Sequence, residues 1–186
     1  MATNNQIKIV EGILSNQPKN INFLSPLGFR FTLRRSPTVN FFVTDANIPS
    51  FDLGFINQVT PFSNIKRPGD KPEWGSFSLT FKVDEDFVNY LEIYNWMLGL
   101  GFPNNYEQYS KLAQSSPGSG VGITSDGTLT ILNSSMAPNM EVQLFDIFPI
   151  SLSQVDFTTT DTSINYVTAT VEFKFTTLIF NKLNGY

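Results

Sequence analysis

The amino-acid sequence predicts a mainly β protein, built from two packed antiparallel sheets (a sandwich or an open barrel) with one flanking α-helix. Apolar and polar residues alternate along several stretches, which is typical of half-buried antiparallel strands. One stretch, FVNYLEIYNWMLGLG, instead has apolar residues at helical spacing. The chain of 186 residues suits one domain, because compact domains contain about 50–250 residues.

Six stretches are predicted to be strands. In chain order they are residues 28–35, 39–44, 76–83, 127–132, 141–153 and 166–175. The alternation is clearest in the third of these, where Phe77, Leu79 and Phe81 are expected to face the core. Pro149 cannot donate a ladder hydrogen bond, so we expect a bend or bulge there, where the strand passes between the two sheets.

Residues 84–99 are predicted to form the helix. Asp84 suits the N-cap, and the acidic residues that follow it favour the positive end of the helix dipole. Gly99 suits the C-terminal end, and Pro103 prevents continuation. The stripe expected to cover the sheet consists of Phe87, Tyr90, Leu91, Tyr94 and Leu98. Trp96 is expected to pack in the core.

Three segments fall outside this pattern. Residues 1–22 are predicted to be an N-terminal arm, preceding a β-sandwich domain of residues 23–186, with apolar residues available to a partner. Residues 47–72 are predicted to be a long loop, but they carry many large apolar side chains, and exposed apolar patches usually mark contact surfaces. Residues 104–126 are polar, and we expect an inserted loop that lacks core residues.

The composition argues against most catalytic chemistry. The chain has no Cys and no His, which removes disulfides, thiolate nucleophiles, imidazole bases and ordinary zinc sites. The net charge of −4 argues against the wrapping of DNA. The acidic run 84–86 is explained by the helix dipole rather than by a metal, and Arg34 and Arg35 by a polar strand face. We therefore expect no catalytic residue, cofactor, metal site or membrane anchor.

The order of the segments carries a more specific resemblance. The chain reads FRFTLRRSPTVNFFVTDANIPSF, GFINQVTPFSNIKRPGD, WGSFSLTFKVDED, the helix FVNYLEIYNWM, and then MEVQLFDIFPISLSQVDF and NYVTATVEFKF. This succession resembles the tail tube proteins of contractile-tailed (T4-like) bacteriophages. The resemblance covers roughly residues 29–180, interrupted by the insertion at 104–126, and type VI secretion tube proteins share the fold.

The resemblance implies a structural protein that forms hexameric rings. The rings stack into a hollow tube inside a contractile sheath and conduct DNA into the host. The implied partners are further copies of the chain, the tail sheath protein, a tape measure protein in the lumen, and the baseplate hub and tail terminator at the ends. DNA passes through without specific binding. The protein is then expected in the virion, after assembly in the host cytoplasm.

Two surfaces follow from this interpretation. Edge-to-edge joining of sheets between subunits would close a ring into one large barrel. The 47–72 loop would reach the adjacent ring, and its predicted contact residues are Ile48, Pro49, Phe51, Phe55, Ile56, Phe62 and Ile65. The predicted lumen-facing residues are Thr168, Thr170 and Glu172.

Several alternatives remain at this point. A tube-end protein, either a terminator or a baseplate tube initiator, has the same fold as a repeating subunit, and so does a type VI secretion tube protein. A monomeric β-sandwich binding module would need aromatic residues on an exposed strand face, whereas most Phe residues here alternate inward. An enzyme would depend on a carboxylate pair that the sequence does not single out.

Overall fold

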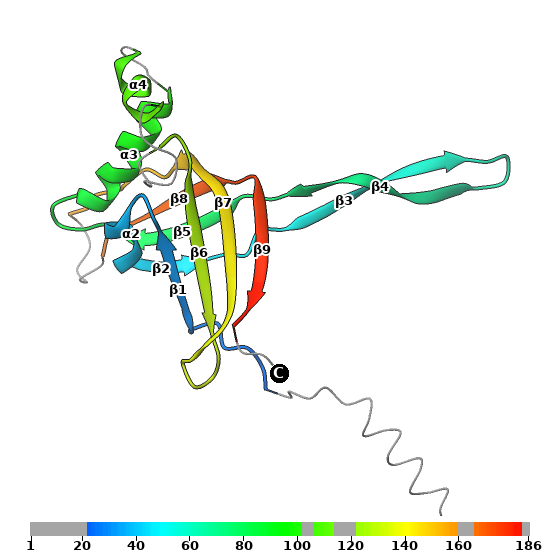
Figure 1. Cartoon of the computed structure of the whole chain (residues 1–186), viewed down its shortest axis with the longest axis horizontal. Coiled ribbons are helices and arrows are strands. Elements are labelled where there is room, and N and C mark those ends of the chain that lie inside the picture. The colour runs from blue at the N-terminus through cyan, green and yellow to red at the C-terminus, as the bar shows by residue number, and fades with distance from the viewer. Residues whose placement is uncertain (1–21, 102–105, 114–121, 160–165, 184–186) are drawn as a thin grey trace, which may run out of the picture.

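The computed structural model describes residues 22–101, 106–113, 122–159 and 166–183 (Figure 1). The elements in chain order are β1 (Phe29–Leu33), α2 (Pro37–Phe41), β2 (Val43–Ala46), β3 (Phe51–Val59), β4 (Asn64–Trp74), β5 (Phe77–Lys82), α3 (Val88–Gly101), α4 (Glu107–Ala113), β6 (Ser125–Leu132), β7 (Pro138–Leu152), β8 (Thr168–Lys174) and β9 (Thr177–Lys182).

Seven strands form the body, in two antiparallel sheets that share β7. Sheet A has the order β1-β6-β7-β9, and sheet B has the order β7-β8-β5-β2. Strand β7 pairs with β9 through residues 140–145 and with β8 through residues 148–152. The ladder to β8 shifts register between Pro149 and Ser151. The predicted bulge at the passage between sheets is therefore confirmed, as is the prediction of two antiparallel sheets.

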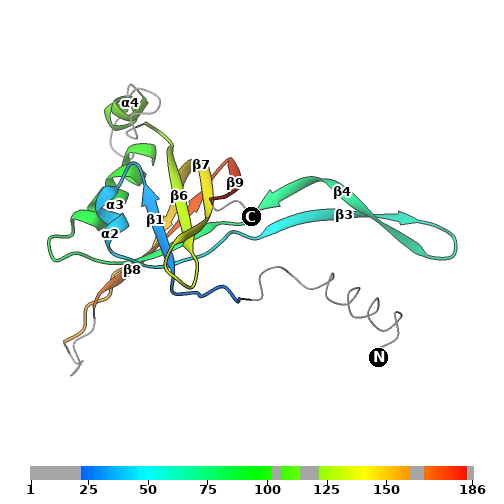
Figure 2. The same ribbon diagram turned by 60° about the horizontal axis from the view of Figure 1, so that its bottom comes forward.

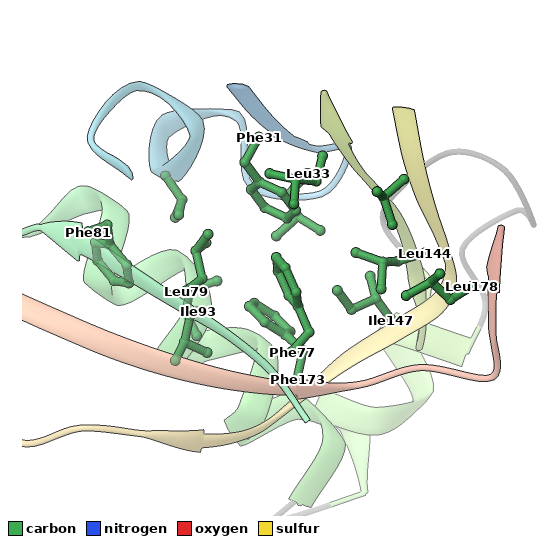
Figure 3. Close-up of a cluster of buried hydrophobic side chains, with 14 of the residues drawn as sticks. Phe31, Leu33, Phe77, Leu79, Phe81, Ile93, Leu144, Ile147, Phe173 and Leu178 are labelled. Atoms are coloured by element: carbon green, nitrogen blue, oxygen red, sulfur yellow. The ribbon is translucent and has the colours of Figure 1, made fainter. Parts of the chain in front are cut away.

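The core lies between the two sheets and is rich in phenylalanine (Figure 3). Phe31 of sheet A is 5.2 Å from Phe77 of sheet B, measured between ring centroids. Phe173 of β8 lies 6.2 Å from Phe77 and 6.2 Å from Trp96 of α3, so the helix closes the same core. The inward positions predicted for residues 76–83 are confirmed, because Phe77, Leu79 and Phe81 are fully buried.

The predicted start of the helix is wrong and its predicted buried face is wrong in part, although the prediction that Trp96 packs in the core is confirmed. Helix α3 begins at Val88, and Phe87 before it has a φ of 58°, so Asp84 does not cap it. The buried residues of α3 are Asn89, Ile93, Trp96 and Gly99, whereas Leu91 and Tyr94 of the predicted stripe are exposed. Asn89 belongs to the buried face because its side chain is satisfied there: Nδ2 donates to the Lys82 carbonyl (2.8 Å) and Oδ1 accepts from the Asp84 amide (3.2 Å).

The predicted second strand, residues 39–44, is wrong in part. The short helix α2 occupies residues 37–41, and strand β2 begins at Val43. Pro37 is compatible with the first turn of a helix. The side chain of Asn40 accepts from the Leu33 amide (2.7 Å) and donates to the Leu33 carbonyl (3.2 Å), which holds α2 against the end of β1.

Two predicted loops contain regular structure. Residues 47–72 include strand β3 and most of β4, which pair as an antiparallel hairpin. The 104–126 segment includes α4 and the first residues of β6. The carbonyl of Ile123 accepts a hydrogen bond from Trp96 Nε1 (3.0 Å), so the end of this segment supports the core. The described helices are thus three rather than one, and residues 1–21 of the predicted arm lie outside the described residues.

Candidate assembly surfaces

The β3–β4 hairpin extends away from the body on one side (Figures 1 and 2). Every residue of β3 is exposed, and Phe62 in the connecting turn is 99% exposed. The hairpin's exposed large apolar residues are Phe51, Leu53, Phe55, Ile56, Val59, Phe62 and Ile65. A surface with so many large apolar side chains is typical of a protein that buries it against a partner.

The structure brings most of the predicted contact residues together on this hairpin. Ile48, Phe51, Phe55, Ile56, Phe62 and Ile65 are all exposed. Pro49 differs from them because it is buried at the base of the hairpin. Leu53 and Val59 are exposed on β3 but were not among the predicted contact residues. The alternation of side chains along the strand identifies them, because Leu53 and Val59 point to the same face as Phe55.

Apolar side chains lie on both faces of the hairpin beyond its bulge. Phe55 pairs with Pro68 and Val59 with Asn64, so Phe55 and Val59 share one face. Ile56 and Gln58 point to the opposite face, because each lies next to a residue of the first face along β3. Ile65 pairs with Gln58 across the hairpin, so it lies on this opposite face as well. A partner that encloses the hairpin would therefore bury apolar surface from two sides.

The bulge depends on a close approach of two glycines. Between the pairs Leu53–Pro72 and Phe55–Pro68, strand β3 contributes only Gly54 and strand β4 contributes residues 69–71. A Cβ atom on Gly69 would lie 2.5 Å from the Gly54 carbonyl oxygen, a distance that real side chains do not tolerate. Glycine at position 69 therefore allows the two strands to cross at the bulge.

The base of the hairpin is fixed to the body by polar and aromatic contacts. Asn47 Oδ1 accepts from the Ser78 amide (2.6 Å), and Asn47 Nδ2 donates to the Ser76 carbonyl (3.3 Å). The Trp74 ring lies 4.4 Å from Phe51 and 6.1 Å from Phe175, between centroids, so it links the hairpin to the residue that follows β8. These contacts set the direction in which the hairpin leaves the body.

We expect the substitution Asn47→Ala to destabilise the protomer by about 1–2 kcal/mol, because two hydrogen bonds that join the residue after β2 to the start of β5 are lost. Denaturant unfolding of the dispersed protein measures the change. The matched control is Asn57→Ala, in an exposed part of β3, which should alter the free energy of unfolding by no more than about 0.5 kcal/mol. Equal effects of the two substitutions would show that Asn47 does not anchor the hairpin.

The outer face of sheet B is polar and rich in hydroxyl groups. The predicted lumen residues Thr168, Thr170 and Glu172 lie on it, opposite Lys82, Thr80 and Ser78 of β5. The hydroxyls of Thr80 and Thr170 are 3.0 Å apart. The outward charges of these two strands are Lys82, Glu172 and Lys174, and the exposed Asp45 of β2 pairs with Thr80 on the same face. Two basic and two acidic side chains balance, so the acidic excess of the chain is not located on this face.

Sheet B ends in two unpaired edges within the described residues. Strand β2 pairs only with β5, and residues 148–152 of β7 pair only with β8. Open edges expose unpaired backbone amides and carbonyls, which proteins normally cover or pair. Sheet B therefore offers two edges to which strands of other subunits can add.

Arg35 is a structural residue rather than part of a nucleic-acid surface. Its guanidinium lies 4.8 Å from the centroid of the Trp96 ring and donates a hydrogen bond to the Gly122 carbonyl. Burial lowers the pKa of Arg35 from its ordinary value.

Among the described residues, no group of three or more His, Cys, Asp or Glu side chains is placed to hold a metal ion. No helix in the described part of the chain is long and apolar enough to cross a membrane.

Comparisons with known proteins identify the fold. No family model matches the chain, and no curated protein matches its sequence. Among solved structures, the tube-terminating cap of the anti-feeding prophage has a TM-score of 0.58 at 13% identity, with 91% of this chain and 98% of that chain covered. A chain of the sheath–tube complex of PVC, an extracellular contractile injection system, has a TM-score of 0.51 at 14% identity, with 98% and 100% covered. A chain of the PVC sheath/tube terminator has a TM-score of 0.54 at 12% identity, with 87% and 99% covered. The resemblance to the tail tube fold is confirmed at the level of the fold.

Proposed function

We propose that this chain, which has the fold of tube-type structural proteins of contractile injection systems, is the repeating subunit of a bacteriophage contractile tail tube. Copies would form hexameric rings, and the rings would stack into a hollow tube. The observation that carries the proposal is the β3–β4 hairpin, which projects from the body and exposes large apolar residues on both faces. Such a hairpin suits insertion into an adjacent ring.

Sheet B supplies the edges for closing the ring. Strand direction alternates from β7 through β8 and β5 to β2, because all three pairings are antiparallel. Copies related by rotation about one axis keep the same strand directions, so β2 of one copy would run antiparallel to the free edge of β7 in the next. This head-to-tail contact repeats around the ring and leaves no open edge in the barrel.

The lumen assignment follows from the same closure. The outer face of sheet B would line the channel, with Thr168, Thr170 and Glu172 pointing into it. A channel lined by hydroxyl groups and few charges would hold DNA only weakly, since tight binding requires many basic contacts to phosphates. DNA would pass through without specific binding, and before ejection a tape measure protein would fill the lumen.

Other partners of the proposed tube lie outside the ring. The contractile sheath would surround it, and the baseplate hub and tail terminator would occupy its ends. The matched PVC sheath–tube complex supports the sheath as a partner, and the matched cap and terminator support end proteins. The protein would then be part of the virion, and its role would be structural rather than enzymatic.

A tube-end protein is the second candidate function. The matched cap and terminator structures have TM-scores of 0.58 and 0.54, above the 0.51 of the sheath–tube chain. The two functions differ in the number of stacking surfaces they require. A repeating subunit must contact a ring on each side, whereas an end protein contacts a ring of tube subunits on one side only.

Negative-stain electron microscopy of the purified protein across a concentration series tests the proposal. We expect rings at low concentration and long hollow tubes with a regular axial repeat at high concentration. Light scattering of the rings would give the mass of six copies. Rings that never elongate would favour the tube-end function. A monomer at every concentration would contradict both the repeating-subunit and the tube-end functions and would favour a monomeric binding module.

A further inference from the structure

We propose that the pole of the body opposite the hairpin is the docking surface for the hairpin of a second copy. This pole consists of the turn between β5 and α3, residues 83–87, and the described parts of the β7–β8 connection, residues 153–159 and 166–167. The inference rests on the proposed function, and it assigns the acceptor surface that ring stacking requires.

The two surfaces lie at opposite ends of sheet B. Strand β5 begins two residues after Gly75, whose amide donates to the Ser50 carbonyl (2.9 Å) at the base of the hairpin. It ends at Lys82, and the next residue, Val83, bonds the Val167 carbonyl (2.8 Å) in the β7–β8 connection. Figures 1 and 2 show the hairpin on one side of the body and the β5–α3 turn on the other. Head-to-tail stacking needs donor and acceptor surfaces in this arrangement.

The pole carries two exposed aromatic residues, Phe157 and Tyr166, and Phe157 packs against the partly buried Phe87. The Phe87 ring lies 6.2 Å from Phe157 and 5.9 Å from Tyr90, between centroids. Phe157 is 73% exposed and Tyr166 is 70% exposed. Tyr166 lies beneath the Lys82 ammonium, at 4.3 Å from ring centroid to nitrogen. These rings offer apolar area to the apolar residues of an incoming hairpin.

The charges of the two surfaces are complementary. Residues 55–69, the distal part of the hairpin, contain two basic side chains, Lys66 and Arg67, and no acidic one. The pole carries the acidic turn 84–86, in which Glu85 and Asp86 are exposed, and the exposed Asp156 precedes Phe157, whose ring contacts Phe87. Because helix α3 begins only at Val88, these acidic side chains are not used to cap it. Opposite charges on two mating surfaces favour this pairing and fix its register.

The distal basic residues already lie against apolar or polar groups of the hairpin itself. Lys66 Nζ is 5.2 Å from the centroid of the Phe55 ring, and Arg67 Nε donates to Gln58 Oε1 (2.7 Å). Both cations are thus held at the hairpin surface, one on each face. A partner surface that carries aromatic rings next to carboxylates would therefore complement the apolar side chains and the two cations of the hairpin.

The hairpin is long enough to contact an extended surface. Strand β3 has nine residues, so it spans roughly 30 Å. The described parts of the β7–β8 connection also extend from the body (Figure 2). If the hairpin of one copy lies along this connection in the next, its distal part reaches the acidic turn at the base of the connection. Phe157 and Tyr166 would then face the apolar residues of β3.

Charge reversal in the full chain tests the pairing. The hairpin variant is Lys66→Glu/Arg67→Glu, and the pole variant is Glu85→Lys/Asp86→Lys. We expect each to raise the protein concentration at which tubes appear by about tenfold or more, while rings still form. The variant with all four substitutions should form tubes at close to the wild-type concentration. The control Glu107→Lys/Asp126→Lys changes the net charge as the pole variant does, at exposed positions elsewhere, and should leave the concentration unchanged.

The outcomes separate this inference from the proposed function. If the hairpin variant blocks tubes but the pole variant does not, the hairpin still stacks rings and the acceptor assignment is overturned. If both block tubes and the combined variant does not restore them, the pairing of these charges is overturned. If the wild-type protein forms neither rings nor tubes, the proposed function fails and this inference fails with it.

Discussion

The substitution Phe62→Asp is expected to leave the protomer folded and to abolish the stacking of rings. Phe62 is 99% exposed in the turn between β3 and β4, so its loss removes no core contact. The turn is held by the Thr60 amide, which bonds the Ser63 carbonyl (3.1 Å), and this bond does not involve the Phe62 side chain. A carboxylate at this position would have to be desolvated when an adjacent ring covers the hairpin, which costs several kcal/mol.

Two measurements and one control variant define the result. Denaturant unfolding should show a change of no more than about 0.5 kcal/mol, as for other exposed substitutions. Electron microscopy should show rings without tubes. The matched control Phe62→Leu keeps an apolar side chain and should still form tubes. Tubes of normal length from Phe62→Asp would show that the hairpin tip is not buried between rings, and the same test applies to Phe55→Asp on the strand.

Local alternation explains how much of the fold could be predicted. In a strand, successive side chains point to opposite faces, so a sequence such as SFSLTFKV defines its buried face without tertiary information. The structure confirms this for β5, and for β8 through Ala169, Val171 and Phe173. The break at Pro149 was equally local, because a residue without an amide hydrogen cannot donate to a ladder and is often found at a bulge.

The face of helix α3 was not determined locally. Nearly every turn of this helix contains apolar residues, so more than one stripe fits helical spacing. The choice depends on Asn89, whose side chain bonds the Lys82 carbonyl and the Asp84 amide. A polar residue satisfied in this way can be buried, and its partners come from the strand end rather than from the helix. Burial of Asn89 turns Leu91 and Tyr94 outward.

The sequence predicted that residues 47–72 form a contact surface, but it did not predict that they fold as a hairpin of two paired strands. Its large apolar residues indicated contact with a partner, yet its prolines and glycines suggested a loop. The structure reconciles these features at the bulge, where Gly54 and Gly69 approach each other and Pro68 and Pro72 lie on either side. Because a bulge interrupts the phase of alternation, a period-two pattern could not be followed from one end of β4 to the other.

The substitution Phe173→Ala is expected to destabilise the protomer by about 3–5 kcal/mol, a large share of the stability of a typical domain. Phe173 is fully buried at the point where β5, β7, β8 and α3 meet. Its backbone pairs with Phe77 on one side and Pro149 on the other, and its ring contacts Trp96. Neighbours on both adjacent strands and on the helix restrict collapse of the structure into the cavity, so the cost should be near the upper end.

Denaturant unfolding of dispersed protein, below the concentration at which rings form, measures this loss. Phe157→Ala is the matched control, because it removes the same side chain from an exposed position and should change the free energy of unfolding by no more than about 0.5 kcal/mol. The two variants also separate folding from assembly: Phe157→Ala should weaken stacking while leaving the fold intact, whereas Phe173→Ala should impair rings and tubes alike through the loss of folded protomer. A loss of less than about 1 kcal/mol for Phe173→Ala would mean that this junction does not hold the sheets and the helix together.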